Sequence, residues 1–267
     1  MELGSVRRPV RQLRKSLQGL TGDPAMRDVH DLRTRSRRVE AIAGMLNGAS
    51  GKSRHHLLKA LKPLRKAAGD VRDMDVLAAK ARTLAGRGCD ASLRPLLEHL
   101  QARRVESARS LADVVNEYGT DARDGLEQFS RRIKRQFEGE AGGHSLQTDA
   151  ATGLMDELSR WPEFREENLH EFRIKVKELR YVLQLTEAAE PRFIAALERV
   201  KSRIGDWHDW MELRRIAGEV LDLRKDRAVL REIKEIESGK LKLALGAARG
   251  LRARYLGPHR GGVEGEA

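Results

Sequence analysis

The chain has 267 residues, a formal charge of +12 at pH 7 and only 4% aromatic residues. This composition is typical of packed amphipathic helices, and the positive charge favours a polyanionic partner over a small neutral metabolite. The single cysteine, Cys89, excludes an internal disulfide and a four-cysteine zinc site. No stretch approaches the roughly 20 apolar residues of a membrane span. We therefore expect a cytoplasmic protein without membrane contact.

Apolar residues at helical spacing predict a series of helices in the first half of the chain, with glycines marking their ends. The opening segment, 6–20, is expected to form a short basic helix. Further helices are expected at 25–47, 52–68, 72–87 and about 90–137. Pro63 falls inside the second of these, where it should kink the helix or mark its true start.

The second half of the chain repeats this order of elements. Helices are expected at 165–189, 191–204, 207–224 and 226–255, and no segment shows the two-residue alternation of a strand. A glycine-rich stretch, 139–143, lies between the halves. We therefore predict an all-α protein with an internal duplication, in which 1–138 and 151–257 are two helical repeats, 139–150 is a linker and 258–267 is a disordered tail.

Two matched segments, Gly69-Asp-Val-Arg-Asp73 and Gly205-Asp-Trp-His-Asp209, lie 136 residues apart. Glycine suits the position that ends one helix, and the aspartate after it suits the N-cap of the next. We interpret both segments as mainly structural. Two further roles are open to them, metal ligation and orientation of a neighbouring arginine.

A histidine followed by cations also occurs twice, at an interval of 140 residues. On a wheel of about 100° per residue, these cations lie beside the apolar face of their helix. On a single helix, such cations are explained by Lys and Arg side chains that cover apolar surface while their charged ends reach water. Two copies of the pattern, each without interleaved acidic residues, incur repulsion between like charges, which favours an anionic ligand. The apolar faces are predicted to be Val29, Leu32, Ser36, Val39, Ala43 and Leu46, and Leu169, Phe172, Val176, Leu179 and Leu183.

The motifs His30-x-x-Arg33-x-x-x-Arg37-Arg38 and His170-Glu-x-Arg173-x-x-x-Lys177-x-x-Arg180, with the segment from Gly69, resemble the CHAD family, the conserved-histidine α-helical domain, over nearly the whole chain. The resemblance implies two four-helix bundles related by a pseudo-two-fold axis, and binding of inorganic polyphosphate in a basic central cavity. Carried over by position, the polyphosphate-binding residues are His30, Arg33, Arg37, Arg38, Arg65, Arg72, His170, Arg173, Lys177, Arg180 and Lys201.

One position departs from the family pattern. Glu40 stands where a further basic residue is usual, at the position that matches Arg180. We expect that it either weakens binding by the first half or pairs with a neighbouring arginine.

The function implied by the resemblance is non-catalytic binding of polyphosphate, with no catalytic residue, metal or cofactor and with association with polyphosphate granules. Nucleic acid is the alternative polyanion, because Trp207, Trp210 and Tyr181 could stack on bases, although the two tryptophans also suit core packing.

A metal-dependent helical phosphohydrolase is a weaker alternative, suggested by the pairs His30-Asp31 and His170-Glu171. Its chemistry needs carboxylates and imidazoles that converge on a metal. Here each carboxylate lies about 100° around the helix from its histidine, and the surrounding arc holds mainly Arg and Lys. The pattern therefore favours anion binding over hydrolysis.

Overall fold

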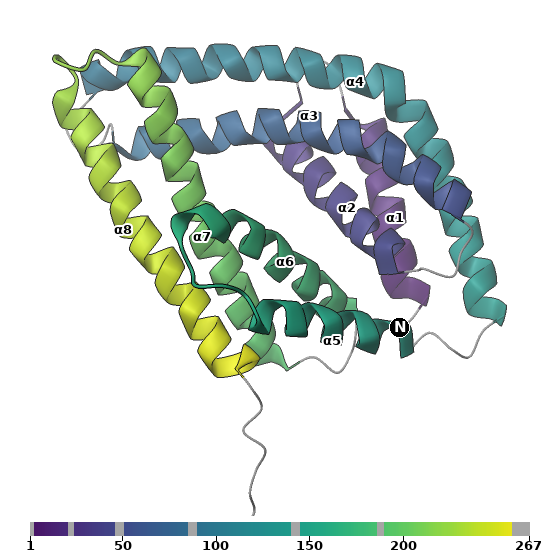
Figure 1. Ribbon diagram of the computed structural model, residues 1–267. Helices are drawn as coiled ribbons and strands as arrows, with labels where there is room; N and C mark the ends of the chain where they lie inside the picture. The colour runs from purple at the N-terminus through teal and green to yellow at the C-terminus, as the bar shows by residue number, and fades with distance from the viewer. Residues whose placement is uncertain are drawn as a thin grey trace, which may run out of the picture. The chain divides into compact units, whose positions relative to one another are not determined.

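The computed structural model describes residues 3–20, 24–45, 51–84, 90–139, 145–185 and 190–257. Within these ranges every regular element is helical and no strand occurs, which confirms the predicted all-α class (Figure 1). The predicted tail, 258–267, and Cys89 lie outside the described residues. The helices are α1 Leu3–Gln18, α2 Met26–Met45, α3 Gly51–Leu84, α4 Asp90–Gly139, α5 Ser145–Ser159, α6 Glu166–Leu185, α7 Pro191–Val220 and α8 Arg227–Leu251, the last extended by a π-helical turn, Arg252–Leu256.

Helices α3 and α7 are longer than the sequence indicated. Each runs without interruption through its glycine, Gly69 or Gly205, so the prediction that these glycines end a helix and that the next aspartate caps another is wrong. A glycine costs about 1 kcal/mol of helix propensity. Burial of the flanking face outweighs that cost, since Ala68 and Val71 are completely buried and Trp207 is 2% exposed.

Pro63 also lies inside α3 and does not mark its start. The helix continues past it because Leu61 and Leu64 are both completely buried on either side. Helix α5 was not expected from the sequence, and it begins within the predicted linker. Among its described side chains only Ala151 and Leu158 are buried, so the apolar period that marks the other helices is weak here.

The chain forms two units, and each combines segments that are distant in sequence. Unit one consists of Met1–Leu146 with Asp209–Glu237, and unit two of Gln147–His208 with Ser238–Ala267. The chain therefore passes from one unit to the other within α7 and again within α8. The duplication of 1–138 and 151–257 stays a prediction from the sequence.

In unit one, α1 packs on α2 and α4, α2 on α3, and α3 on α4 (Figure 1). Its apolar core continues from the end of α3 and the start of α4 onto the last turns of α7 and the first turns of α8. The segment 209–237 thus supplies part of the core of unit one, through Trp210, Leu213, Ile216, Ala217, Leu221, Val229 and Ile233.

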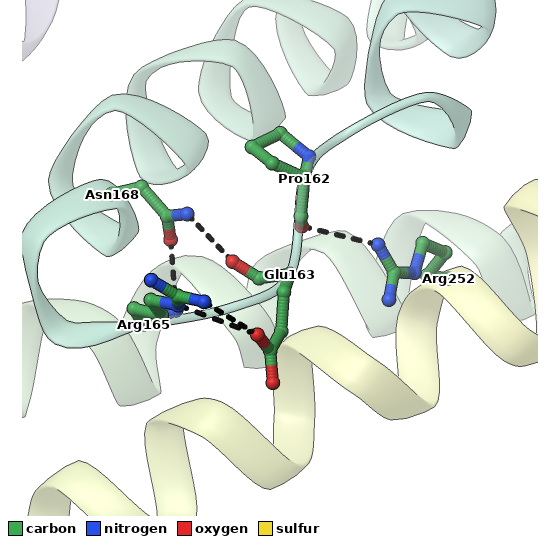
Figure 2. A network of polar contacts seen from close by, with 5 residues as sticks. All are labelled: Pro162, Glu163, Arg165, Asn168 and Arg252. Carbon is green, nitrogen blue, oxygen red and sulfur yellow. Dashed lines mark hydrogen bonds and ion pairs between the residues drawn. The ribbon is translucent and has the colours of Figure 1, made fainter.

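In unit two, the loop before α6 is fastened to the end of α8. Arg252 donates to the carbonyl oxygens of Trp161 at 2.7 Å and Pro162 at 3.3 Å, and its guanidinium lies 4.5 Å from the centroid of the Phe164 ring. Figure 2 shows how Asn168, in the first turn of α6, holds the same loop: it donates to the Glu163 carbonyl and accepts from the Arg165 amide. These contacts fix the start of the helix that carries the second basic motif.

Candidate anion-binding site

The predicted apolar faces of α2 and α6 are confirmed. Every described member of both sets is buried, from complete burial of Val29 and Leu169 to 9% exposure of Leu183, while Leu46 lies outside the described residues. The cations lie on the flank beside these faces. His30, Arg38 and His170 are exposed, and Arg33, Arg37, Arg65, Arg72, Arg173, Lys177, Arg180 and Lys201 are half-buried.

In unit one, the side chain of Arg33 crosses the backbone of α3 at Gly69. A Cβ atom on Gly69 would lie 3.6 Å from Nε of Arg33. The same guanidinium donates through Nη1 to Oδ1 of Asp73 at 3.2 Å. The aspartate one turn after the glycine orients Arg33, so this segment orients a neighbouring arginine and does not cap a helix.

In unit two, Arg173 of α6 lies on Gly205 of α7 in the same way. A Cβ atom there would lie only 2.7 Å from Nη2 of Arg173, closer than real contacts allow. Nε of Arg173 donates to the carbonyl oxygen of Lys201 at 3.2 Å. The two matched sequence motifs therefore bring arginine and glycine together in each unit.

Each unit places one glutamate among these cations, but on different helices. In unit one Glu40 of α2 accepts from Arg65 at 2.8 Å, so the expectation that it pairs with a neighbouring arginine is confirmed. In unit two Glu198 of α7 pairs with Arg180 at 3.2 Å and with Lys201. The glutamate therefore lies on the helix of the basic motif, α2, in unit one, and on the helix that faces that motif, α7, in unit two.

The charges around Glu198 fix its ionisation. Burial alone would raise the pKa of this carboxyl, but the hydrogen bond and charge of Lys201, together with the charge of Arg180, outweigh burial and lower the pKa. Glu198 is therefore a carboxylate near neutral pH, and it holds two candidate phosphate ligands in position.

A pair of histidines distinguishes unit two. The ring centroids of His170 and His208 lie 5.2 Å apart, and His208 stands where Arg72 stands in the first motif. Partial burial of the ring lowers the pKa of His170, and the positive charges of His208, Arg173 and Lys177 lower it further. The neutral imidazole is thus favoured while no anion offsets these charges.

The aromatic residues near the second motif do not form a platform for bases. Trp207 and Trp210 are 2% and 5% exposed. The guanidinium of Arg180 lies over the Tyr181 ring, 4.9 Å from its centroid. The tryptophans therefore serve core packing and are not available to stack on bases.

The carboxylate that follows His30 is engaged on its own helix. Asp31 forms an ion pair with Arg35, one turn later, at 2.7 Å. Across the described ranges, no three His, Cys, Asp or Glu side chains converge where they could hold a metal ion. In the same part of the chain, no helix combines the length and apolar character that crossing a bilayer requires.

The two glycines give a matched test of the arginine contacts. Gly69→Ala places its Cβ at an ordinary contact distance, so we expect the helix to gain about 0.5–1 kcal/mol with Arg33 in place. Gly205→Ala collides with the Arg173 guanidinium and should displace it, offsetting that gain. Thermal unfolding and crystal structures of both variants measure this. An unmoved Arg173 in Gly205→Ala would contradict the interpretation.

Comparisons with known proteins agree with this fold. The family model of the CHAD domain matches residues 5–218. The crystal structure of the CHAD domain from the plant Ricinus communis is similar to this chain with a TM-score of 0.59 and 16% identity, over 94% of this chain and 89% of that chain, which is a likeness of fold. No curated protein matches. Because the family model spans most of the sequence, the chain belongs to the CHAD family.

Proposed function

We propose that this protein binds inorganic polyphosphate without transforming it. The observation that carries the proposal is the seating of Arg33 on Gly69 and of Arg173 on Gly205, each beside a histidine and further cations. Guanidinium groups present a planar fork of donors that matches phosphate oxygens, and Lys177 adds a compact charge. A repeated chain of phosphates suits a repeated set of such donors.

The electrostatics supply the driving force. Half-buried cations of like sign repel one another more strongly than cations in bulk water, because the effective dielectric constant is lower. Glu40 and Glu198 offset part of that repulsion, one in each unit. A condensed anion would offset the rest. We propose that polyphosphate is this anion and that the cations of each unit contact it, as the family resemblance implies.

A titration tests the proposal. Polyphosphate of defined length is added to the protein in a calorimeter at low and at moderate salt, and the melting temperature is measured alongside. We expect a rise in melting temperature and an affinity that falls steeply with salt, because neutralised phosphates release counterions. A melting curve unmoved by excess polyphosphate at low salt would count against the proposal. An RNA that displaces polyphosphate more readily than the reverse would favour nucleic acid as the ligand.

Binding is expected to depend on pH through His170. Its folded pKa lies below the ordinary value of 6.5, so the unfolded chain takes up the proton first as pH falls. Without polyphosphate, the stability contributed by neutral His170 is present above pH 6.5 and is lost as pH falls toward the folded pKa. A bound anion favours the imidazolium, so polyphosphate should raise this pKa and bind more tightly at mildly acidic pH.

Proton NMR titration of the His170 ring, with and without polyphosphate, measures this shift. His208→Ala is the matched variant, since removing the neighbouring charge should raise the pKa of His170 in the ligand-free protein. A ligand-free pKa at or above 6.5 would contradict the prediction.

We further propose that the protein acts in the cytoplasm at polyphosphate granules. A fluorescent fusion should gather at granules in cells that store polyphosphate and disperse when the arginines on Gly69 and Gly205 are reversed in charge. Storage, regulation and scaffolding are all compatible with such binding.

A further inference from the structure

Helix α1 carries a second concentration of arginines, separate from the proposed polyphosphate-binding residues. One face of the helix is in the core of unit one, since Val10, Leu13 and Leu17 are at most 3% exposed. The neighbouring face carries Arg7, Arg8, Arg11 and Arg14, all exposed, and the helix contains no acidic residue. Because its apolar face is already buried, α1 cannot insert that face into a bilayer, and the arginines require another explanation.

These arginines line a cavity between α1 and α4. Its volume is about 550 Å³, within the usual range for small-molecule sites. Val10 and Leu126 lie at its base but are almost completely buried, and Ser130 contributes a hydroxyl group. The charged residues that line it are Arg7, Arg8, Arg11 and Arg14 from α1, and Glu127 and Arg131 from α4.

Among the described residues that line this cavity, positive charges outnumber negative ones. Five arginines face one glutamate, which leaves an excess of four positive charges. Glu127 is already paired with Arg131 at 2.5 Å. Within the described ranges, none of the four α1 arginines forms an ion pair. Like charges three and four residues apart destabilise a helix, so the cluster calls for an external anion.

We propose that this cavity is a second anion site, which binds the oligophosphate group of a small molecule. Several guanidinium groups around an open cavity suit a compact, multiply charged phosphate group, since each can donate two parallel hydrogen bonds. Free oligophosphate and the phosphate group of an organic molecule share this chemistry, and the two probes below separate them. The site goes beyond the proposed polyphosphate surface because it uses α1 and α4, whereas that surface uses α2, α3, α6 and α7.

The experiment uses inorganic tripolyphosphate and ATP as two separate probes, titrated by calorimetry. The site variant is Arg11→Gln with Arg14→Gln, exposed changes that remove like charges and should leave the fold intact. The matched control is Arg109→Gln with Arg227→Gln, two exposed arginines outside the cavity that carry the same total charge. The site variant and the control are also each combined with Arg33→Glu and Arg173→Glu, which disable the proposed polyphosphate surface.

With that surface disabled, we expect tripolyphosphate still to bind to the matched control. The site variant should weaken this binding by about tenfold or more, because it loses charged hydrogen bonds. ATP that binds equally well would assign the site to phosphorylated organic molecules, and tripolyphosphate alone would assign it to inorganic oligophosphate. Loss of all binding in the disabled background, or equal affinity of site variant and control, would overturn the inference and leave the proposed function intact.

Discussion

The double variant Arg33→Glu, Arg173→Glu is expected to lose polyphosphate affinity by roughly 10² to 10⁴-fold. Each arginine is half-buried and lies against a glycine of the neighbouring helix. A neighbouring cation therefore cannot easily take the place of its guanidinium group. A hydrogen bond to a charged group contributes about 1.5–3 kcal/mol, and two such losses correspond to this range. Reversal of charge adds repulsion toward phosphate.

Calorimetry at fixed salt and pH measures the loss, with circular dichroism as the check on folding. The variant Arg109→Glu, Arg227→Glu makes the same change in net charge at exposed positions away from both candidate sites. It should lower affinity only slightly, through the long-range field. If the two double variants weaken binding equally, then overall charge and not the seated arginines determines affinity, and the proposed site is wrong.

Asp75→Ala is expected to destabilise the protein by about 3–5 kcal/mol, the usual effect of removing one partner from a buried ion pair. Asp75 of α3 is 4% exposed, and its Oδ1 accepts from Nε of Arg104 of α4 at 2.9 Å. The same guanidinium donates to the carbonyl oxygen of Pro24 at 3.0 Å. The pair therefore joins α3, α4 and the segment before α2, and its loss leaves a positive charge near the core.

Thermal unfolding should show a melting temperature lower by roughly 6–20 °C, given the usual relation for a unit of this size. Glu98→Ala is the matched control, because its ion pair with Arg94 has the same length of 2.9 Å but side chains that are 65% and 80% exposed. It should cost less than about 1 kcal/mol. Equal destabilisation by the two variants would show that burial of the Asp75 pair is not what makes it important.

The features that the sequence predicted well are those set by burial at a regular period. The faces of α2 and α6 follow from the spacing of Val29, Leu32 and their counterparts, because a helix side against a core must repeat about every 3.6 residues. The cations beside those faces followed from the same wheel. Local spacing determines such features, so one sequence is enough to find them.

The features that it missed depend on contacts between distant residues. Gly69 and Gly205 look like helix ends. Only the close approach of Arg173 from α6 reveals why glycine is needed at position 205, whereas an alanine would fit at position 69. Likewise the sequence predicted a basic helix at 6–20, but the cavity beside it exists because α4 lies opposite. Nothing local in Trp210 or Leu213 indicates that they complete the core of unit one.

The position of the segment 209–237 also affects how the protein is made. On the ribosome, the first 146 residues emerge well before this segment, which belongs to the same unit. At ordinary translation speeds of 5–20 residues per second, the delay is roughly 5–20 s. During that interval the nascent chain exposes the apolar sides of α3 and α4, because Leu84, Leu93 and Leu96 are not yet covered by the core residues of 209–237. Chaperone capture is therefore most needed at this stage of synthesis.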